Sequence, residues 1–319
     1  MKHHIYTQAN AASAEAYKLL LQKHYDTIHV SGTPWIISCP VTASTGDIAI
    51  PLATDTYPYD YSSSVMDGIR PPTAITLTGT RVGIFSDLHY PRDYNDQVSA
   101  ADNLRYLTET MDAFTARSTV LNLSLGDNVY NAADRTASQA AIAAITEVFQ
   151  GTTRMAVGNH DVVGTLLANW MEDAATWTPD ENFTLDVGDN WRIIVLTTYV
   201  RTDPCTTSEP WLVAALQQSK LDNKYIIVVS HIRLLQTGDI DPYYELESPL
   251  LRDAITSAYA GGAKIRVVMN GHYHAFNLLV SGGIPYYTIS SVTFYGNAYA
   301  LTLDDVNGEF ALEKFDIVL

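Results

Sequence analysis

From residue 80 onward the chain alternates short apolar runs with longer helical stretches, and this alternation limits the folds open to it. The apolar runs are continuous, as in strands buried on both faces, and they read RVGIFS, TVLNLSL, TRMAV, WRIIVLTTY, KYIIVVS and KIRVVMN. Helical patterns lie between them, over residues 97–117, 137–149, 163–175, 209–219 and 248–260. Strands alternating with helices predict an α/β domain.

The C-terminal runs have a different pattern. FNLLVSG, PYYTISS and AYALTLDDVNGEFALEKFDIV alternate apolar and polar residues, and VNGE is typical of a tight hairpin turn. Hairpins place neighbouring strands antiparallel. We therefore expect sheets that mix parallel and antiparallel pairing.

The first 78 residues follow neither pattern. They offer one helical stretch over residues 11–25, then short β-prone runs at 26–41 and 46–53, and then a stretch rich in Tyr, Ser, Asp and Pro with no sustained period. We expect two parts, an N-terminal extension over 1–78 and one large α/β domain over 79–319. The extension is interpreted either as packing against the domain or as an attachment or oligomerisation segment that joins a larger assembly.

Composition narrows the class of protein. With 319 residues, of which 47% are hydrophobic, the chain can bury a large core, and its formal charge of −16 disfavours nucleic acid as a partner. No apolar run is long enough to span a bilayer, and the N-terminus shows no Sec-type signal. We expect a soluble protein, whose cellular compartment the sequence does not indicate.

Polar residues recur where each buried strand ends. The runs are followed in turn by SDLH, GDN, GNHD, SH and NGHYH, and these segments hold all five histidines found after residue 80. Each segment alone is commonly a turn or a helix cap. Because the carboxyl ends of strands form the ligand-binding edge of an open α/β sheet, we expect the five segments to converge on one site. Imidazole, carboxylate and amide side chains in one site predict metal binding.

The five segments resemble the calcineurin-like metallophosphoesterases, whose pattern runs D-x-H, GD, GNH followed by D or E, a lone H, and GHxH. The resemblance extends from about residue 79 to the C-terminus, and all five blocks are intact. It implies a four-layer αββα sandwich with mixed sheets and a dinuclear metal centre at the carboxyl ends of the strands.

Carried over residue by residue, the resemblance implies seven metal ligands. One metal would be bound by Asp87, His89, Asp127 and His274. The other would be bound by Asp127, Asn159, His231 and His272, with Asp127 bridging the two. Mixed nitrogen and oxygen ligands suit divalent transition metals such as Mn, Fe, Zn, Co or Ni better than Ca or Mg.

The implied activity is hydrolysis of a small phosphoester by a metal-activated hydroxide that attacks phosphorus in line. His160 resembles the non-ligand histidine that stabilises the transition state or protonates the leaving oxygen. Asp161 is expected either to orient His160 or to cap the following helix. Both are the predicted catalytic residues.

Two details bear on the branch of the family. Tyr130 stands where purple acid phosphatases have an iron-binding tyrosine, but that group has glycine in place of His89, so we expect Tyr130 to be a packing residue or pocket wall. The D-x-H form is similar to cyclic-nucleotide and glycerophosphodiester phosphodiesterases, which favours a phosphodiesterase over a phosphomonoesterase. The alternative hypothesis is a non-catalytic structural or binding protein that keeps the fold and joins a viral or cell-surface assembly through residues 1–78.

Overall fold

The computed structural model describes residues 3–8, 29–31, 35–40, 79–91, 99–130, 135–161, 182–198, 202–235 and 245–319. Before residue 41 and over 135–139, only the backbone is described. The helices expected over 11–25 and 163–175 and the irregular stretch before residue 75 lie outside these ranges.

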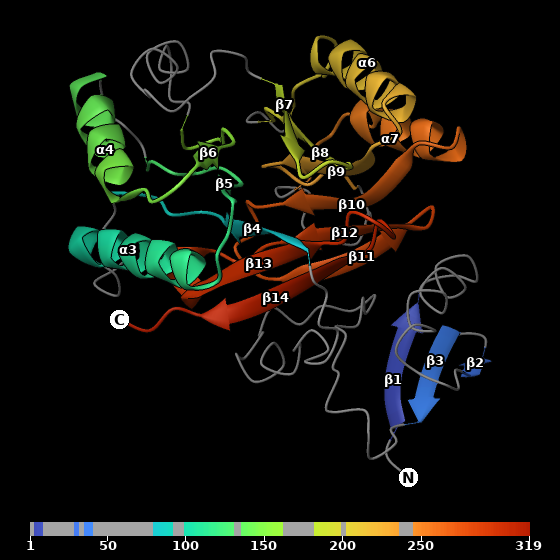
Figure 1. Ribbon diagram of the computed structural model, residues 1–319, viewed down its shortest axis with the longest axis horizontal. Coiled ribbons are helices and arrows are strands. Elements are labelled where there is room, and N and C mark those ends of the chain that lie inside the picture. The colour runs from blue at the N-terminus through green and yellow to red at the C-terminus, as the bar shows by residue number, and fades with distance from the viewer. Residues whose placement is uncertain are drawn as a thin grey trace.

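Two mixed sheets form the centre of the molecule (Figure 1). The five-stranded sheet has the order β14-β13-β4-β5-β6, with strands Phe310–Asp316, Asn297–Leu303, Thr80–Phe85, Leu121–Ser124 and Thr153–Met155. The six-stranded sheet has the order β11-β12-β10-β9-β8-β7, with strands Asn277–Ser281, Ile284–Thr288, Lys264–Asn270, Tyr225–Ser230, Trp191–Leu196 and Phe183–Val187. A third, three-stranded sheet joins β1 (His3–Gln8), β3 (Trp35–Pro40) and β2 (His29–Ser31).

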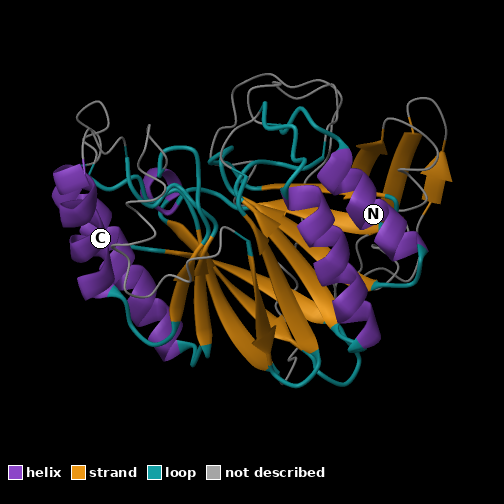
Figure 2. Cartoon of the chain, turned by 90° about the horizontal axis from the view of Figure 1, so that it is seen from above, coloured by secondary structure: helices purple, strands orange, loops and turns teal. Residues whose placement is uncertain are grey.

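Helices cover the outer faces of the two large sheets, so that the domain has four layers (Figure 2). Helices α3 (Ala100–Ala116) and α4 (Arg135–Val148) pack on the five-stranded sheet. Helices α6 (Ser208–Leu221) and α7 (Leu250–Ala260) pack on the six-stranded sheet. The expected αββα sandwich is confirmed.

The strands are continuous apolar runs because successive side chains point to opposite faces of the sheet and each face is buried in a core. In β4, Val82 and Ile84 enter the core between the sheets, whereas Phe85 faces the core beneath the helices. The same division occurs in β9, where Ile227 and Val229 face the opposite sheet while the intervening Val228 packs toward α6 and α7. Each strand therefore contributes to two cores, and both of its faces are apolar.

Helix α3 shows why the chain becomes helical after β4. Ser99 and Asp102 form a capping box, in which the Asp102 amide donates to the Ser99 hydroxyl at 3.2 Å and the Ser99 amide donates to the Asp102 carboxylate at 3.3 Å. Leu107, Met111 and Phe114 then form one buried stripe at helical spacing. This stripe packs on the five-stranded sheet beside β4 and fixes the loop that follows the strand.

Within the described ranges, the expected elements agree with the structure except at their ends and at three additions, and the β-prone run expected at 46–53 lies outside these ranges. The expected C-terminal hairpin is present as β13 and β14. Strands β1 and β7 and the short helix α8 (Val292–Tyr295) were not expected. Strand β7 is a short edge strand paired antiparallel with β8. The alternation of apolar and polar residues in FTLDV was the one sequence signal for this strand.

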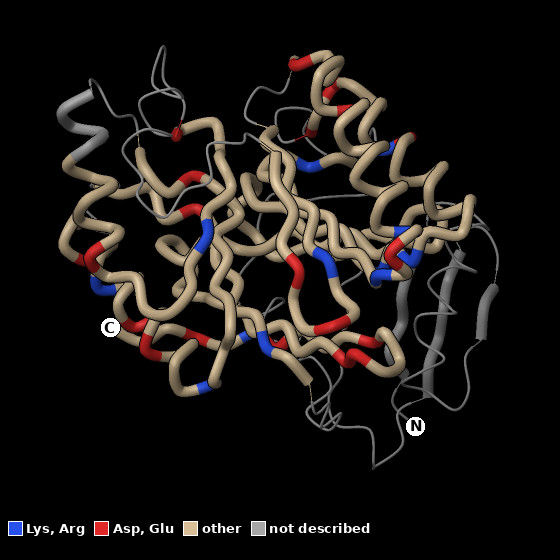
Figure 3. The backbone as a smooth tube through the Cα atoms, turned by 45° about the horizontal axis from the view of Figure 1, so that its top comes forward, with Lys and Arg blue, Asp and Glu red and all other residues tan. Residues whose placement is uncertain are grey.

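Charged residues of both signs are intermixed on the described part of the chain (Figure 3). Basic residues lie scattered among the acidic ones in this view, and the sequence has 35 acidic residues against 19 basic ones. Within the described ranges, each helix is too short or too polar to cross a membrane.

Candidate metal centre

The five polar segments all follow strands that run in parallel within their own sheets. Strands β4, β5 and β6 are parallel neighbours in one sheet, and β9 and β10 are parallel neighbours in the other. Hydrogen bonds join the segments beyond the strands: the Asp87 amide donates to Gly126 at 3.0 Å, and the Gly271 amide donates to His231 at 3.0 Å. The His272 amide donates to the Asp87 carboxylate at 3.2 Å and so joins the segments of one sheet to those of the other.

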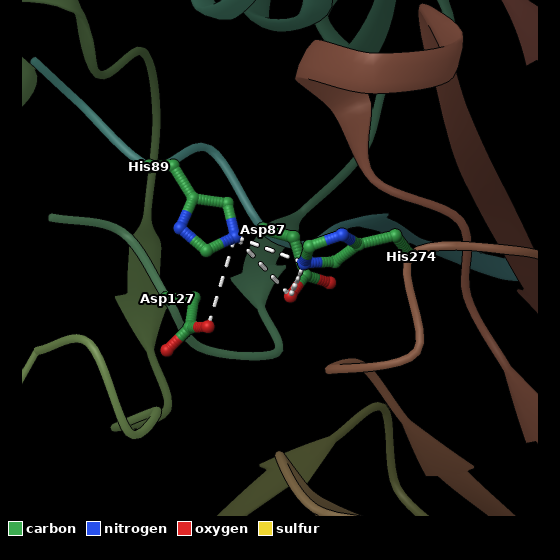
Figure 4. A group of neighbouring side chains, drawn as sticks. All are labelled: Asp87, His89, Asp127 and His274. Atoms are coloured by element: carbon green, nitrogen blue, oxygen red, sulfur yellow. Dashed lines mark hydrogen bonds and ion pairs between the residues drawn. The ribbon is translucent and has the colours of Figure 1, made fainter. Parts of the chain in front are cut away.

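The first group of side chains is Asp87, His89, Asp127 and His274 (Figure 4). The Nε2 atoms of His89 and His274 lie 3.0 Å apart, and His274 Nε2 lies 3.5 Å from Asp87 Oδ1. Asp127 Oδ2 lies 3.7 Å from His89 Nε2. Two facing imidazole nitrogens and two carboxylate oxygens suit a cation that all four could bind.

The second group is Asp127, His231 and His272, and Asn159 joins it. His231 Nε2 lies 3.2 Å from Asp127 Oδ2 and 3.1 Å from Asn159 Oδ1. The other nitrogen of this ring, Nδ1, lies 2.9 Å from the carbonyl oxygen of Leu125 and can only donate to it. A neutral His231 therefore directs the lone pair of Nε2 toward Asp127 and Asn159, as a metal ligand requires.

Asp127 belongs to both groups. The hydrogen bonding of its two carboxylate oxygens shows whether the site suits metal ions. Its Oδ1 accepts a hydrogen bond from the His160 amide at 2.8 Å. With His231 neutral, its Oδ2, which is buried between His231 and His89, accepts no hydrogen bond within the described structure. A buried carboxylate oxygen without a donor is costly, and ions on either side would satisfy it. The residues present thus fit two metal ions.

The backbone at these side chains adopts an unusual conformation. Asp87, His89, Asp127, His272 and His274 all have φ between 52° and 67°, the left-handed region that non-glycine residues avoid. These are five of the eight such non-glycine residues in the described ranges. Strained conformations of this kind gather at functional sites.

Two glycines of the motifs are explained by close approach. A Cβ atom on Gly158 would collide with Asp127, at both its amide nitrogen and its carboxylate. One on Gly271 would collide with the Ser86 hydroxyl and meet Asp87 Oδ2 at 3.0 Å. The glycines therefore allow three loops to close around the same carboxylates.

Electrostatics within the centre are governed by burial and by the shared carboxylates. Burial raises the pKa of Asp87 to about 7, and the charge of Asp127 adds to this rise. Burial and Asp127 raise the pKa of Asp161 to about 7 in the same way. Burial alone would lower the pKa of His231, but the adjacent Asp127 raises it to about 9. Without metal the centre therefore holds protons that bound cations would displace.

The two predicted catalytic residues lie beside this centre. His160 is half-buried, and its ring lies 4.9 Å from that of His89 between centroids. Asp161 is buried, and its carboxylate accepts from the amides of Val129 and Gly158, both at 2.8 Å, and from the Asn128 side chain at 3.2 Å. It thus ties the GDN segment to the GNHD segment. The helix that it was expected to cap lies outside the described residues.

Several supporting residues could not be identified from the sequence. Ser86 donates to Asp87 Oδ2 at 2.6 Å, and Ser291 donates to the Asp87 carbonyl at 2.8 Å. Phe294 of α8 stacks on His274, with centroids 4.7 Å apart. Ser291 and Phe294 are distant from every motif in sequence and carry no pattern of their own, so only the folded chain shows their part in the site.

Comparison with known proteins finds one family that matches more than half of the chain. Residues 80–276 match the family model of the calcineurin-like phosphoesterases. A dimetal phosphatase from Danio rerio has a similar structure, with a TM-score of 0.59 at 13% identity over 75% of this chain and 98% of that one. No curated protein matches the chain.

Two larger proteins share the fold over part of their length. A putative 5'-nucleotidase from Staphylococcus aureus has a TM-score of 0.53 at 13% identity, over 76% of this chain and 55% of that one. A purple acid phosphatase from yellow lupin (Lupinus luteus) has a TM-score of 0.51 at 14% identity, over 77% of this chain and 55% of that one. At such identities the likeness concerns the fold alone.

Proposed function

The chain belongs to the calcineurin-like phosphoesterase family, and we propose that it is a dinuclear metal-dependent hydrolase that prefers phosphodiesters. The observation that carries the proposal is the sharing of Asp127 between two groups of ligand-type side chains. One ion would be held by Asp87, His89, Asp127 and His274, and the other by Asp127, Asn159, His231 and His272. When bound, the ions would supply an activated water and offset the charge of the phosphoryl oxygens.

The protein's own contribution begins with rigidity. Asp87 and Asp127 are fully buried, and the His272 amide donates to both oxygens of Asp87 at 3.2 Å. The Asp127 carboxylate is held by the His160 amide. Because the ligands are fixed before substrate arrives, little free energy is lost in organising them during the reaction.

His160 is proposed to protonate the leaving oxygen. It lies next to the ligand Asn159 in the chain, and it is half-buried where most of the other site side chains are fully buried. Partial exposure leaves it open to substrate, and an alkoxide leaves poorly without a proton donor. A purely structural metal site would not need such a histidine, which favours catalysis over the non-catalytic alternative.

The preference for diesters rests on the D-x-H segment. His89 occupies a coordination position and is fully buried beside Asp127 and His274. This form of the segment is similar to that of phosphodiesterases in the family. The metals themselves are proposed to be divalent transition ions, namely Mn, Fe, Zn, Co or Ni.

The proposal is tested by hydrolysis of bis-p-nitrophenyl phosphate and p-nitrophenyl phosphate after metal stripping and reloading with Mn, Zn, Fe, Co or Ni. We expect metal-dependent turnover and a higher kcat/KM for the diester. Asp127→Asn should lose both bound ions and reduce turnover by at least about a hundredfold.

The matched control is Asp253→Asn, which removes a carboxylate from the exposed face of α7. It should retain the metal content and activity of the unaltered protein. Full activity in Asp127→Asn would contradict the assignment. A protein that binds two ions yet hydrolyses neither ester with any metal would support the non-catalytic alternative, with residues 1–78 as the place to seek a partner.

A further inference from the structure

Tyr130 has no part in the reaction as described so far, although it lies three residues after Asp127. Its amide donates to the Tyr90 carbonyl at 2.9 Å, and the Tyr90 amide donates to Asn128 at 3.0 Å. These bonds extend the parallel pairing of β4 and β5 beyond the ends of the strands. The backbone of Tyr130 is therefore fixed relative to the D-x-H segment.

The ring of Tyr130 stacks on the imidazole of His160. The two ring centroids lie 5.0 Å apart, and the planes differ by 28°. His89 forms T-shaped contacts with both rings, with centroids 5.9 Å from Tyr130 and 4.9 Å from His160. The imidazole of His160 thus contacts the face of the Tyr130 ring and also the ring of His89, a predicted metal ligand.

The backbone of His160 is held by a different contact, the bond from its amide to Asp127 Oδ1. That bond does not restrict rotation of the side chain about χ1 and χ2. A half-buried imidazole can adopt several rotamers, and a flat aromatic face beside it limits them. A proton donor must lie within hydrogen-bond reach of the leaving oxygen, so its orientation affects the rate.

We propose that Tyr130 is a positioning residue that holds the His160 imidazole in the orientation from which it protonates the leaving group. This inference rests on the proposed function, because it assigns His160 that role. The stacking contact is made by the face of the ring. Phenylalanine keeps this face, whereas leucine, which is apolar but not flat, does not.

The first test is independent of activity. In the metal-free and zinc-loaded full-length protein, the Hε1 proton of His160 is assigned by comparison with His160→Asn. Stacking on an aromatic face shields this proton. We expect its resonance to be unchanged in Tyr130→Phe and to move downfield in Tyr130→Leu. An unchanged resonance in Tyr130→Leu would overturn the proposal.

The second test uses the leaving group. Bis-p-nitrophenyl phosphate releases a good leaving group, whereas diphenyl phosphate releases a poorer one that depends more on protonation. Tyr130→Leu should lower kcat for diphenyl phosphate about tenfold more than for the nitrophenyl ester. Tyr130→Phe should stay within about threefold of the unaltered protein for both, and Tyr295→Leu, at an exposed aromatic residue of α8, serves as the control.

Two outcomes would contradict a positioning role. Equal losses for both esters in Tyr130→Leu would indicate a general effect on the fold. Loss of bound iron, together with loss of a visible phenolate-to-iron absorption band in Tyr130→Phe, would identify Tyr130 as a metal ligand. If the unaltered protein hydrolyses no ester with any metal, the proposed function fails, and the His160 resonance alone then decides whether Tyr130 orients this ring.

Discussion

At the scale of single residues, the candidate metal centre depends on backbone conformations that are unfavourable in isolation. Each non-glycine residue in the left-handed region costs about 1–2 kcal/mol, and Asp87, His89, Asp127, His272 and His274 all adopt it. Interlocking hydrogen bonds offset this cost. The His89 amide donates to the Asp127 carbonyl at 2.9 Å, and the His272 amide donates to the Asp87 carboxylate. A substitution that breaks the hydrogen bonds of one polar segment should therefore also destabilise the segments bonded to it.

The proposed role of His160 as a proton donor predicts how the rates for two esters should change. His160→Asn removes the proton donor but leaves the amide that binds Asp127. We expect kcat to fall by about 10²–10⁴-fold for diphenyl phosphate, and by less for bis-p-nitrophenyl phosphate, because the latter needs less help from an acid. Elemental analysis should find the same bound metal as in the unaltered protein. Equal losses for both esters would show that His160 acts in some other way.

Asp161 can be tested against its two expected roles. Asp161→Asn retains one acceptor oxygen, so an amide group would face the N–H of either Val129 or Gly158. Because a buried donor would lose its acceptor, we expect the free energy of unfolding of the metal-free protein to fall by about 1–3 kcal/mol. Chemical denaturation measures this change.

The same variant separates structure from catalysis. If Asp161 only joins the two segments, kcat should fall by the same factor for both esters. A loss that is larger for diphenyl phosphate, as predicted for His160→Asn, would show that Asp161 also orients His160.

At the scale of elements, the site is a property of strand ends and of the glycines between them. The β5 and β6 ends approach so closely that Gly158 has no room for a side chain beside Asp127. At the end of β10, Gly271 lies against Ser86 and Asp87, which follow β4 in the other sheet. These contacts join the two sheets at the metal centre.

Gly271→Ala should therefore separate the sheets at this edge. The added methyl group would collide with Ser86 and press on Asp87, so we expect zinc affinity to fall by at least about tenfold. Gly262→Ala is the matched control, because Gly262 has φ of 89° but open space around its Cβ position. That variant should lose stability from backbone strain alone and keep its zinc affinity, as judged by calorimetric titration and thermal unfolding.

At the scale of the whole molecule, two sheets must pack in register for the site to exist. The core between them includes Val82 and Ile84 from one sheet and Val229 and Met269 from the other. These residues lie within the strands that end at the metal centre. Burial of this core, at about 25 cal/mol per Å² of apolar surface, stabilises the arrangement that brings the buried side chains of Asp87, Asp127 and Asp161 and of His89, His231 and His272 together.

Because these groups are buried close together, the free energy of unfolding of the metal-free protein should depend on pH. In the metal-free protein Asp127 raises the pKa of His231 to about 9, above the value of about 6.5 in an unfolded chain. The stabilisation from protonated His231 is complete below pH 6.5 and is lost as the pH rises through 9. The free energy of unfolding should therefore fall between pH 7 and 9, by up to about 1.4 kcal/mol per pH unit.

Bound metal should reverse this trend, because it replaces the proton on His231. Zinc should raise the unfolding temperature more at pH 9 than at pH 7, since fewer protons must be displaced. Thermal unfolding with and without zinc at the two pH values measures both effects. A metal-free protein whose stability rises over this range would show that His231 is neutral.

The sequence pattern predicted the α/β class and the five convergent segments, and the family resemblance implied the four-layer sandwich. The pattern could do so because buried strands must be apolar on both faces, and because strand ends are where polar side chains can leave the core, as Asp87 does after β4 and His231 does after β9. The division between residues 78 and 79, and the roles of His160 and Asp161, remain predictions.

Tertiary structure alone decided which groups touch across those segments. Stacking of Tyr130 on His160, of Phe294 on His274, and the bond from Ser291 to Asp87 join residues from different elements. Such contacts leave no periodic pattern, because they depend on the packing of the two sheets and on backbone turns at single residues. Local chemistry thus determined which residues could form the centre, whereas the packing of the sheets determined how they are oriented within it.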